Sequence, residues 1–303
     1  MRTTLVIGTR GSALALKQAD IARQALLAAE PTLRIEIRVV TTRGDVDSAS
    51  IPLDVVGKGW FTKEVEQALL ETSIDVAVHS LKDLPEELPD GLAIGAYLPR
   101  EDARDVLITR DNEPLEDVKP GAVIGTDSIR RQLQMRALRP DVRIESVRGN
   151  VPTRLEKLAA GPYDALILAA AGIKRLGLDG RITRYFEPHE MTPAPGQGIL
   201  AVEARQADTD LVALLASLSD KEASHAARIE RSFSRMMGDG CKAPTGAYAF
   251  READACMFLG MTADATGNIM RKETRAPWYE SDTLGEQLAE QLLHEREHHA
   301  QRA

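Results

Sequence analysis

Short apolar stretches typical of β-strands alternate along this chain with stretches whose apolar residues recur at helical spacing. The first part of the chain predicts strands over 3–8, 34–40 and 75–80, with helices over 13–29 and 62–71 between them. Parallel strands need a long crossover connection, which is usually a helix. This order of elements therefore predicts a mostly parallel sheet covered by helices.

The same order returns further along the chain, with strands predicted over 121–126, 142–147 and 164–170 and helices over 128–138 and 152–160. Segments punctuated by Pro and Gly separate the two series, at 97–105 and at 192–198. Another strand-like run, ILAVEAR (199–205), follows the second segment. We therefore expect the chain to leave the first unit, build the second and return, which produces a hinge and a cleft between two lobes.

The last 80 or so residues differ, with a helix over 220–237, two or three antiparallel strands and a final helix carrying Leu284, Leu288 and Leu292. The predicted fold is α/β, with two periplasmic-binding-protein-like α/β lobes joined by a double crossover hinge, and a small C-terminal α+β domain. The predicted boundaries are 1–98 with 199–217 for the first lobe, 103–193 for the second, and 220–303 for the C-terminal domain.

Composition excludes several classes of protein. The 303 residues carry a net charge of −8, which argues against bulk nucleic-acid binding. The sequence shows no apolar run long enough to span a bilayer and no cleavable targeting peptide, so we expect a cytoplasmic protein with no membrane partner. Two cysteines, Cys241 and Cys256, are too few for a disulfide framework.

One segment, Gly125 to Arg154, runs against the acidic composition: it holds seven arginines, three acids and no lysine, a net charge of +4. Arginine binds carboxylate or phosphate bidentately and stays charged, so its exclusive use indicates docking of planar anions. The candidates lie in turns after predicted strands, where ligands of open α/β sheets bind. They are Thr126, Ser128, Arg130, Arg131, Arg148 and Arg154, together with Arg10 and Ser12 after the first strand. Arg136, Arg139 and Arg143 are expected to be solvated or to pair with nearby acids.

Three further features carry chemistry. Lys82 and Asp83 follow a strand end, where a carboxylate can stabilise a cation or move a proton, although a loop salt bridge is an alternative. Cys241 lies in the Gly- and Pro-flanked stretch GDGCKAPTG, which suits a reactive thiol, whereas Cys256 is expected in the core. The run HEREH (294–298) matches a zinc-protease pattern but has no downstream third ligand, so we predict no metal site.

Several motifs, taken in order, resemble one family, the porphobilinogen deaminases (hydroxymethylbilane synthases) of tetrapyrrole and haem biosynthesis. The resemblance runs from residue 5 to about 295. It rests on GTRGSALAL (8–16), TRGD (42–45), AVHSLKD (77–83), REDARD (100–105), RGNVPTRL (148–155), PAPGQG (193–198) and GCKAPTGAYA (240–249).

The resemblance implies a transferase that polymerises four porphobilinogen units head to tail, releases ammonia at each step, and then releases hydroxymethylbilane by hydrolysis. It implies one dipyrromethane cofactor, joined through a thioether to Cys241, and a cytoplasmic monomer. Asp83 matches the catalytic aspartate, which stabilises the cation left by the departing ammonia. Each pyrrole carries an acetate and a propionate, which gives the arginines a purpose.

The remaining site residues are carried over from the family in the same way. Cofactor binding falls on Ser80, Lys82, Thr126, Ser128, Arg130 and Arg131. Substrate binding falls on Arg10, Ser12, Gln18, Lys58, Arg148, Arg154, Arg175 and Gln197, with the loop around Lys58 expected to act as a lid.

Three acids depart from the family pattern: Asp54, Asp127 and Asp239. Asp127 stands inside the expected anion site, where it would repel substrate unless it turned away as a helix cap. The rival interpretation is a non-enzymatic two-lobe binder of a small dicarboxylate, which would need neither Cys241 nor Asp83.

Overall fold

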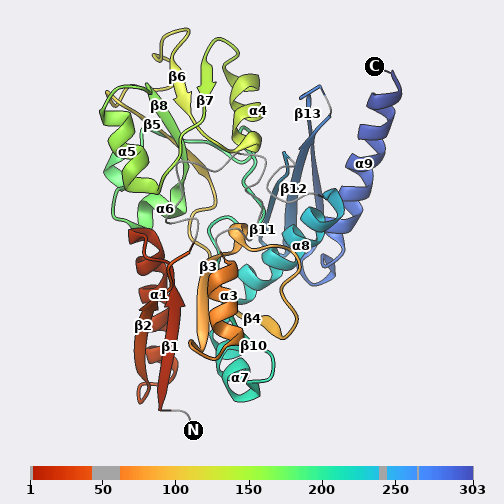
Figure 1. The fold of residues 1–303 in the computed structure, drawn as a ribbon. Coiled ribbons are helices and arrows are strands. Elements are labelled where there is room, and N and C mark those ends of the chain that lie inside the picture. The colour runs from red at the N-terminus through yellow and green to blue at the C-terminus, as the bar shows by residue number, and fades with distance from the viewer. Residues whose placement is uncertain (1–2, 43–61, 239–243, 265, 303) are drawn as a thin grey trace. The chain divides into compact units, whose positions relative to one another are not determined.

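The computed structural model describes residues 3–42, 62–238, 244–264 and 266–302. By its internal contacts the chain forms two compact units, one of residues 1–101 with 199–224 and the other of 102–198 with 225–303 (Figure 1). The chain thus passes out of the first unit and back into it, as the double crossover predicts. The separate C-terminal domain stays a prediction, because its residues group with the second lobe.

The first unit is built on a five-stranded sheet in the order β2-β1-β3-β10-β4. Its strands are β1 (Thr4–Thr9), β2 (Arg34–Val39), β3 (Val76–Ser80), β4 (Leu92–Tyr97) and β10 (Leu200–Arg205). Its helices are α1 (Ala13–Ala29), α3 (Lys63–Leu70), α7 (Thr209–Leu218) and the 3₁₀ turn η1 (Leu81–Asp83). Side chains of α1 and α7 pack on one face of the sheet, and those of α3 pack on the other.

The second unit begins with a sheet of the same design, in the order β7-β6-β8-β5-β9. Its strands are β5 (Asp105–Thr109), β6 (Val123–Gly125), β7 (Arg143–Glu145), β8 (Ala165–Ala169) and β9 (Arg184–Tyr185). Its helices are α4 (Ile129–Leu138), α5 (Val151–Ala159), α6 (Ala170–Arg175) and the turn η2 (Asp179–Arg181). The α4 helix covers one face, while α5 and α6 cover the other.

The expectation of mostly parallel sheets holds for strand direction, because four of the five strands in each of these two sheets run the same way and one runs against them. In each five-stranded sheet two strand pairings are parallel and two are antiparallel. The antiparallel partner is β10 in the first sheet and β5 in the second. Each of these strands directly follows a crossing between the units, β5 the outgoing one and β10 the return, and each runs against its neighbours in the sheet.

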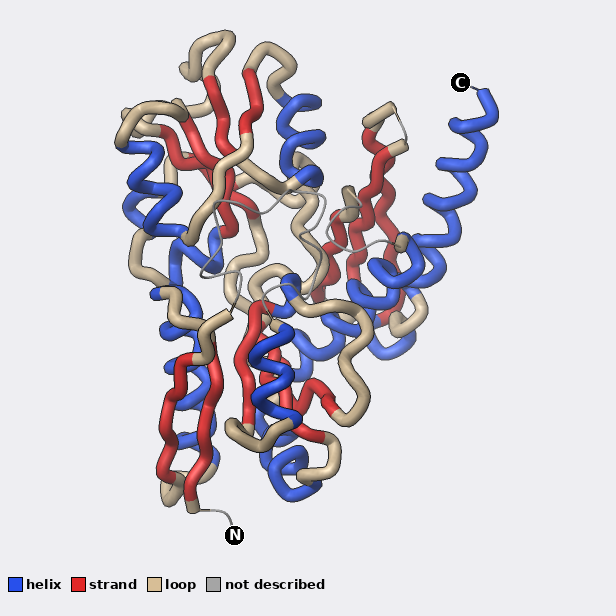
Figure 2. Tube along the Cα trace, viewed as in Figure 1, coloured by secondary structure: helices blue, strands red, loops and turns tan. Residues whose placement is uncertain are grey.

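The remainder of the second unit is an antiparallel sheet, β11-β12-β13, with two long helices (Figure 2). The strands are β11 (Gly246–Glu252), β12 (Ala255–Ala263) and β13 (Ile269–Pro277), and the helices are α8 (Lys221–Met237), α9 (Leu284–Arg302) and the 3₁₀ turn η4 (Trp278–Glu280). The part of α8 from residue 225 onward belongs to this unit. Phe233 of α8 and Phe258 of β12 are fully buried and meet edge to face, with ring centroids 5.4 Å apart. Cys256 is buried in the same core, as predicted.

This aromatic pair gives a test of the core. We expect Phe233→Ala to lower the free energy of unfolding by about 3–5 kcal/mol, because it removes a ring and leaves a cavity. Urea denaturation followed by circular dichroism measures the change. Tyr279→Ala, at a side chain that is 88% exposed, is the matched control and should change stability by less than about 0.5 kcal/mol. Equal losses for the two variants would contradict the assignment.

Candidate active site

In the first unit the predicted residues gather at the carboxyl ends of two neighbouring parallel strands, β1 and β3. Ser12 follows β1 and caps α1, its hydroxyl accepting from the Ala15 amide at 3.2 Å. The buried Gln18 of α1 donates to the Ser80 hydroxyl at the end of β3, at 2.9 Å. Arg10 and Ser12 therefore lie at the same edge of the sheet as the turn that carries Lys82.

The η1 turn presents Asp83 from a rigid base. Leu81 and Leu84 on either side of the reactive positions are buried, at 1% and 0% exposure. The Leu81 amide donates to the Ile199 carbonyl at 3.0 Å, which ties the turn to the start of β10. Asp83 itself is exposed. Two buried anchors thus fix the backbone of a carboxylate that faces solvent.

A buried pair that the sequence interpretation missed lies beneath this turn. His79 Nε2 is 3.0 Å from Glu203 Oε2, and the two side chains are 7% and 0% exposed. Glu66 of α3 is also buried, and its carboxylate accepts from the Thr62 hydroxyl at 2.7 Å. Burial, and to a lesser extent the nearby Glu203 charge, raise the pKa of Glu66. The base of the turn is therefore polar on its α3 side.

In the second unit Arg130 and Arg131 converge on a carboxylate that the sequence interpretation did not identify, that of Asp105. Arg130 Nη1 donates to Asp105 Oδ2 at 2.6 Å, and Arg131 Nη2 and Nε donate to Oδ1 at 2.7 and 3.0 Å. Gln197 Nε2 adds a bond to Oδ1 at 2.9 Å. All four side chains are buried, so the arginines of α4 are not the open turn residues that we expected.

The charges of this cluster do not cancel. Burial alone would raise the pKa of Asp105, but the guanidinium groups of Arg130 and Arg131 hold that pKa well below its usual range. The carboxylate is therefore ionised, and two cations face one anion. A buried excess of one positive charge is costly unless an anion compensates it. The cluster favours binding of a carboxylate.

The two arginines differ in the donors that they retain. All three nitrogens of Arg131 donate inside the protein, to Asp105, Gln197 and the Ile167 carbonyl. Arg130 donates only through Nη1, to Asp105 and to the Thr192 carbonyl at 2.5 Å. Among the described residues, Nε and Nη2 of Arg130 meet no hydrogen-bond acceptor. Arg130 therefore keeps one guanidinium edge for a ligand, which Arg131 does not.

The turn before α4 explains how Asp127 is accommodated. Ser128 caps the helix, its hydroxyl accepting from the Arg131 amide at 3.4 Å, and the Thr126 hydroxyl accepts from the Ser128 amide at 3.3 Å. Asp127 is not the cap: its carboxylate accepts a hydrogen bond from the Ser146 hydroxyl. That bond gives the extra acid of this turn a partner within the protein.

The other arginines of the 125–154 segment are Arg148 and Arg154, predicted as ligand-binding residues, and Arg136, Arg139 and Arg143, which were not. Arg148 precedes α5, and Arg154 lies on α5, where its Nε donates to the Gly149 carbonyl at 2.8 Å. Arg139 pairs with a nearby acid, Asp141, as expected, and it also donates to the carbonyls of Leu115 and Val118 at 2.5 and 2.7 Å. The reason is local, since Arg139 caps the end of α4 beside the 115–118 loop.

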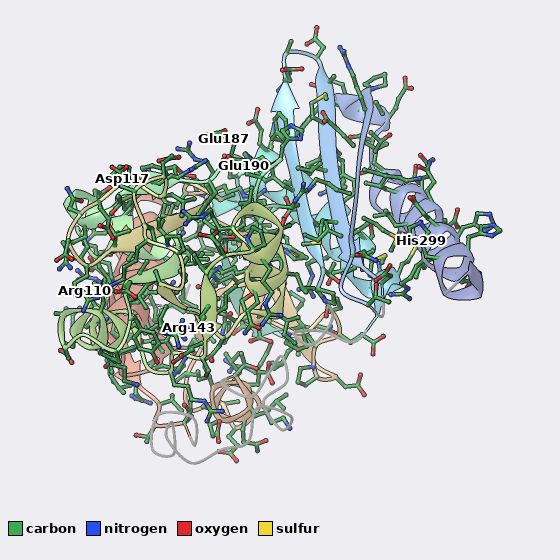
Figure 3. All side chains as sticks on the ribbon, turned by 90° about the horizontal axis from the view of Figure 1, so that it is seen from above. Arg110, Asp117, Arg143, Glu187, Glu190 and His299 are labelled. Atoms are coloured by element: carbon green, nitrogen blue, oxygen red, sulfur yellow. The ribbon has the colours of Figure 1, made fainter. Side chains whose placement is uncertain are left out.

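Arg143 is exposed as expected, and its Nε donates to the Gly121 carbonyl at 3.0 Å (Figure 3). Arg136 is exposed as well. Arg175 ends α6 and donates to the Gly198 carbonyl at 2.7 Å. Lys58, Cys241, Asp54 and Asp239 lie outside the described residues.

The HEREH run lies on α9, where His294 Nε2 and His298 Nε2 are 3.0 Å apart. Within the described ranges no group of three or more His, Cys, Asp or Glu side chains is arranged to hold a metal ion. Among these same residues no helix is both long and apolar enough to cross a membrane.

Comparison with known proteins identifies the family. The model described as "Porphobilinogen deaminase, dipyromethane cofactor binding domain" matches residues 5–213, and "Porphobilinogen deaminase, C-terminal domain" matches 224–294. The chain is 45% identical over 294 residues to the porphobilinogen deaminase of Roseiflexus sp. (strain RS-1), covering 97% of each chain. It is 46% identical over 271 residues to that of Syntrophobacter fumaroxidans, covering 89% of this chain and 87% of the relative.

Among solved structures, the chain is similar to the VFT2 domain of BvgS from Bordetella pertussis. The TM-score is 0.44 at 15% identity, covering 77% of this chain and 92% of that domain.

The Asp105 cluster yields a prediction about stability and pH. We expect Asp105→Asn to lower the free energy of unfolding at pH 7 by about 3–5 kcal/mol, because it leaves two buried guanidinium groups without their carboxylate partner. The folded pKa of Asp105 lies below its ordinary value of 3.8, so its contribution is complete above that value and is lost as pH falls below it.

The stability gap between wild type and Asp105→Asn should therefore narrow as urea unfolding is repeated from pH 7 down to about pH 3. Asp117→Asn, at an exposed carboxylate of the same unit, is the control and should leave stability nearly unchanged (Figure 3). A gap that stays constant over this range would show that the charge of Asp105 is not what matters.

Proposed function

Because the chain belongs to the porphobilinogen deaminase family, we propose that its first unit supplies the reacting carboxylate and its second unit the arginines that bind substrate carboxylates. The protein is a hydroxymethylbilane synthase, a transferase of porphyrin biosynthesis that acts on porphobilinogen and carries a dipyrromethane cofactor. Family membership favours this enzyme over a non-enzymatic dicarboxylate binder. The assignment of individual residues below is our proposal.

The described residues fit a cofactor that carries carboxylates. The observation that carries the proposal is the Asp105 cluster, which is buried, holds one excess positive charge and leaves one edge of Arg130 open. An open guanidinium edge is a bidentate carboxylate site. We propose that Arg130 holds a carboxylate of the dipyrromethane.

The remaining cofactor contacts divide by position. Ser128 of the second unit and Ser80 and Lys82 of the first are proposed as further cofactor contacts from their family positions, and Cys241 would provide the thioether. Arg131 and Thr126 have their donors or hydroxyl engaged within the protein, so we propose that they support the site from behind.

The substrate-binding set is proposed from family positions and from the sheet edges where they lie. It comprises Arg10, Ser12, Gln18, Lys58, Arg148, Arg154, Arg175 and Gln197. Gln197 is fully buried, and its amide nitrogen donates to Asp105 and to the Ala103 carbonyl, so its proposed role is to orient the cluster.

The dipyrromethane, when bound, supplies the pyrrole carbon to which the first substrate unit is joined. The protein's own task is to handle charge and protons on the substrate. Loss of ammonia from the aminomethyl group leaves a cation that shares its charge with the pyrrole N–H. The Asp83 carboxylate, exposed on the pinned η1 turn, would stabilise that cation and then accept a proton.

The location and the partners of the protein are also proposed from its family. We propose a cytoplasmic monomer that acts without nucleic-acid or membrane partners. The acidic composition, with a net charge of −8, supports the absence of a nucleic-acid partner.

Intact mass provides the first test. The purified protein should be heavier than its sequence mass by one dipyrromethane, and Cys241→Ser should have the bare sequence mass and no turnover, because it lacks the thiol that forms the thioether. Cys256→Ser is the control and should keep the added mass, since Cys256 is buried in the core. Wild-type protein that turns over porphobilinogen at the bare mass would contradict the assignment.

Asp83→Asn tests the catalytic carboxylate. We expect turnover of porphobilinogen to fall by about 10²–10⁴-fold, because the amide neither stabilises the cation nor takes the proton. The mass of the variant should still include the cofactor. Asp90→Asn, at another exposed carboxylate of this unit, should keep wild-type turnover. Near-normal turnover by Asp83→Asn would remove Asp83 from its role.

A further inference from the structure

Thr192 lies at a junction between the Asp105 cluster and the antiparallel sheet of the same unit. It is fully buried, and its carbonyl accepts from Arg130 Nη1 at 2.5 Å and from Gln134 Nε2 at 3.2 Å. Its amide donates back to Gln134 Oε1 at 2.8 Å. Arg130 and Gln134 are four residues apart and therefore lie on one face of α4. The place of the Thr192 carbonyl thus sets the direction of the Arg130 guanidinium.

Arg271 of β13 holds the other side of this junction. Its Nε donates to the Thr192 hydroxyl at 2.9 Å, and its Nη2 donates to Gln134 Oε1 at 2.7 Å and to the Glu190 carbonyl at 3.3 Å. Arg271 thus contacts the Thr192 side chain and Gln134, the residue that also bonds the Thr192 backbone.

The environment of Arg271 is unusual for a cation. Burial lowers the pKa of Arg271, and no carboxylate among the described residues forms an ion pair with it. Replacing a buried charge by a well-packed apolar side chain is often neutral or stabilising. Stability alone therefore does not account for an arginine here, whereas the need for three directed donors does.

The same segment is also tied to β11, the strand that begins five residues after Cys241. The Ala247 amide donates to the Pro193 carbonyl at 2.9 Å. A Cβ added at Gly246 would meet the Thr192 carbonyl oxygen at 3.0 Å, so the two backbones are in close contact. Glu230 of α8 accepts from the Gly196 and Ala249 amides at 2.6 and 2.8 Å.

We propose that Arg271 is a positioning residue of the cofactor site, which fixes Thr192 and, through its carbonyl, the open edge of Arg130. The inference rests on the proposed function, in which Arg130 holds a carboxylate of the dipyrromethane. Arg271 acts through Thr192 and Gln134.

Arg271→Met tests the inference, because it removes the donors and keeps much of the bulk. We expect the fraction of purified chain carrying the cofactor, read by intact mass, to fall about 10-fold or more, as misplacing a binding group does. Arg271→Lys should recover part of that fraction, since one donor remains. Arg275→Met, at an exposed side chain four residues along the same strand, should match wild type.

Thermal unfolding separates positioning from stability. Thr192→Val removes the hydroxyl, which accepts from Arg271 and donates to the Pro188 carbonyl at 3.0 Å. It should lower the cofactor-bearing fraction while the chain still unfolds cooperatively, even if Arg271→Met does not fold. Full cofactor loading of either folded variant would overturn the inference.

A double-mutant cycle with Arg130→Lys decides whether Arg271 acts through Arg130. On our proposal, Arg271→Met lowers loading much less in the Arg130→Lys background than in wild type. Fully additive losses would overturn the inference. Normal loading of Arg130→Lys by itself would instead overturn the proposed function, so the two failures are distinguishable.

Discussion

The second unit depends on a carboxylate that lies buried between two guanidinium groups. Asp105 begins β5, Arg130 and Arg131 come from the first turn of α4, and Gln197 comes from the segment that leads back to the first unit. Each ion would be costly to bury alone, and the pairing offsets that cost only while all the partners are in place. The cluster therefore holds a strand, a helix and a crossing segment in one register.

The excess charge of the cluster also gives a reason for arginine at these two positions of the chain. A network that only stabilised the fold would balance its charges, whereas this one keeps one positive charge in excess and one donor edge open on Arg130. On our proposal, a carboxylate of the dipyrromethane completes the balance. Asp83 shows the opposite design: buried leucines pin its turn, and its carboxylate stays in solvent, where it can meet a cation and exchange a proton.

Much of this was accessible from the sequence. Apolar periodicity predicted α1 over 13–29 with the bounds that the structure shows, and α4, α5 and α8 within two residues at each end. It missed β4, β5 and α7. A short apolar run such as LAIGAY or DVLIT does not distinguish strand from helix by period alone. The antiparallel direction of β5 and β10 within their sheets was missed as well, because strand direction depends on how the chain crosses between units.

By itself the sequence determined the alternation of strands and helices, the family, and the chemistry of its candidate residues, because these depend on local spacing and residue type. The tertiary structure decided which arginines can receive a ligand. Arg130 and Arg131 are neighbours with the same side chain, yet only Arg130 keeps an open edge. That difference comes from partners 25 to 66 residues away along the chain. No local pattern encodes such partners, because burial and pairing arise only when distant segments pack together.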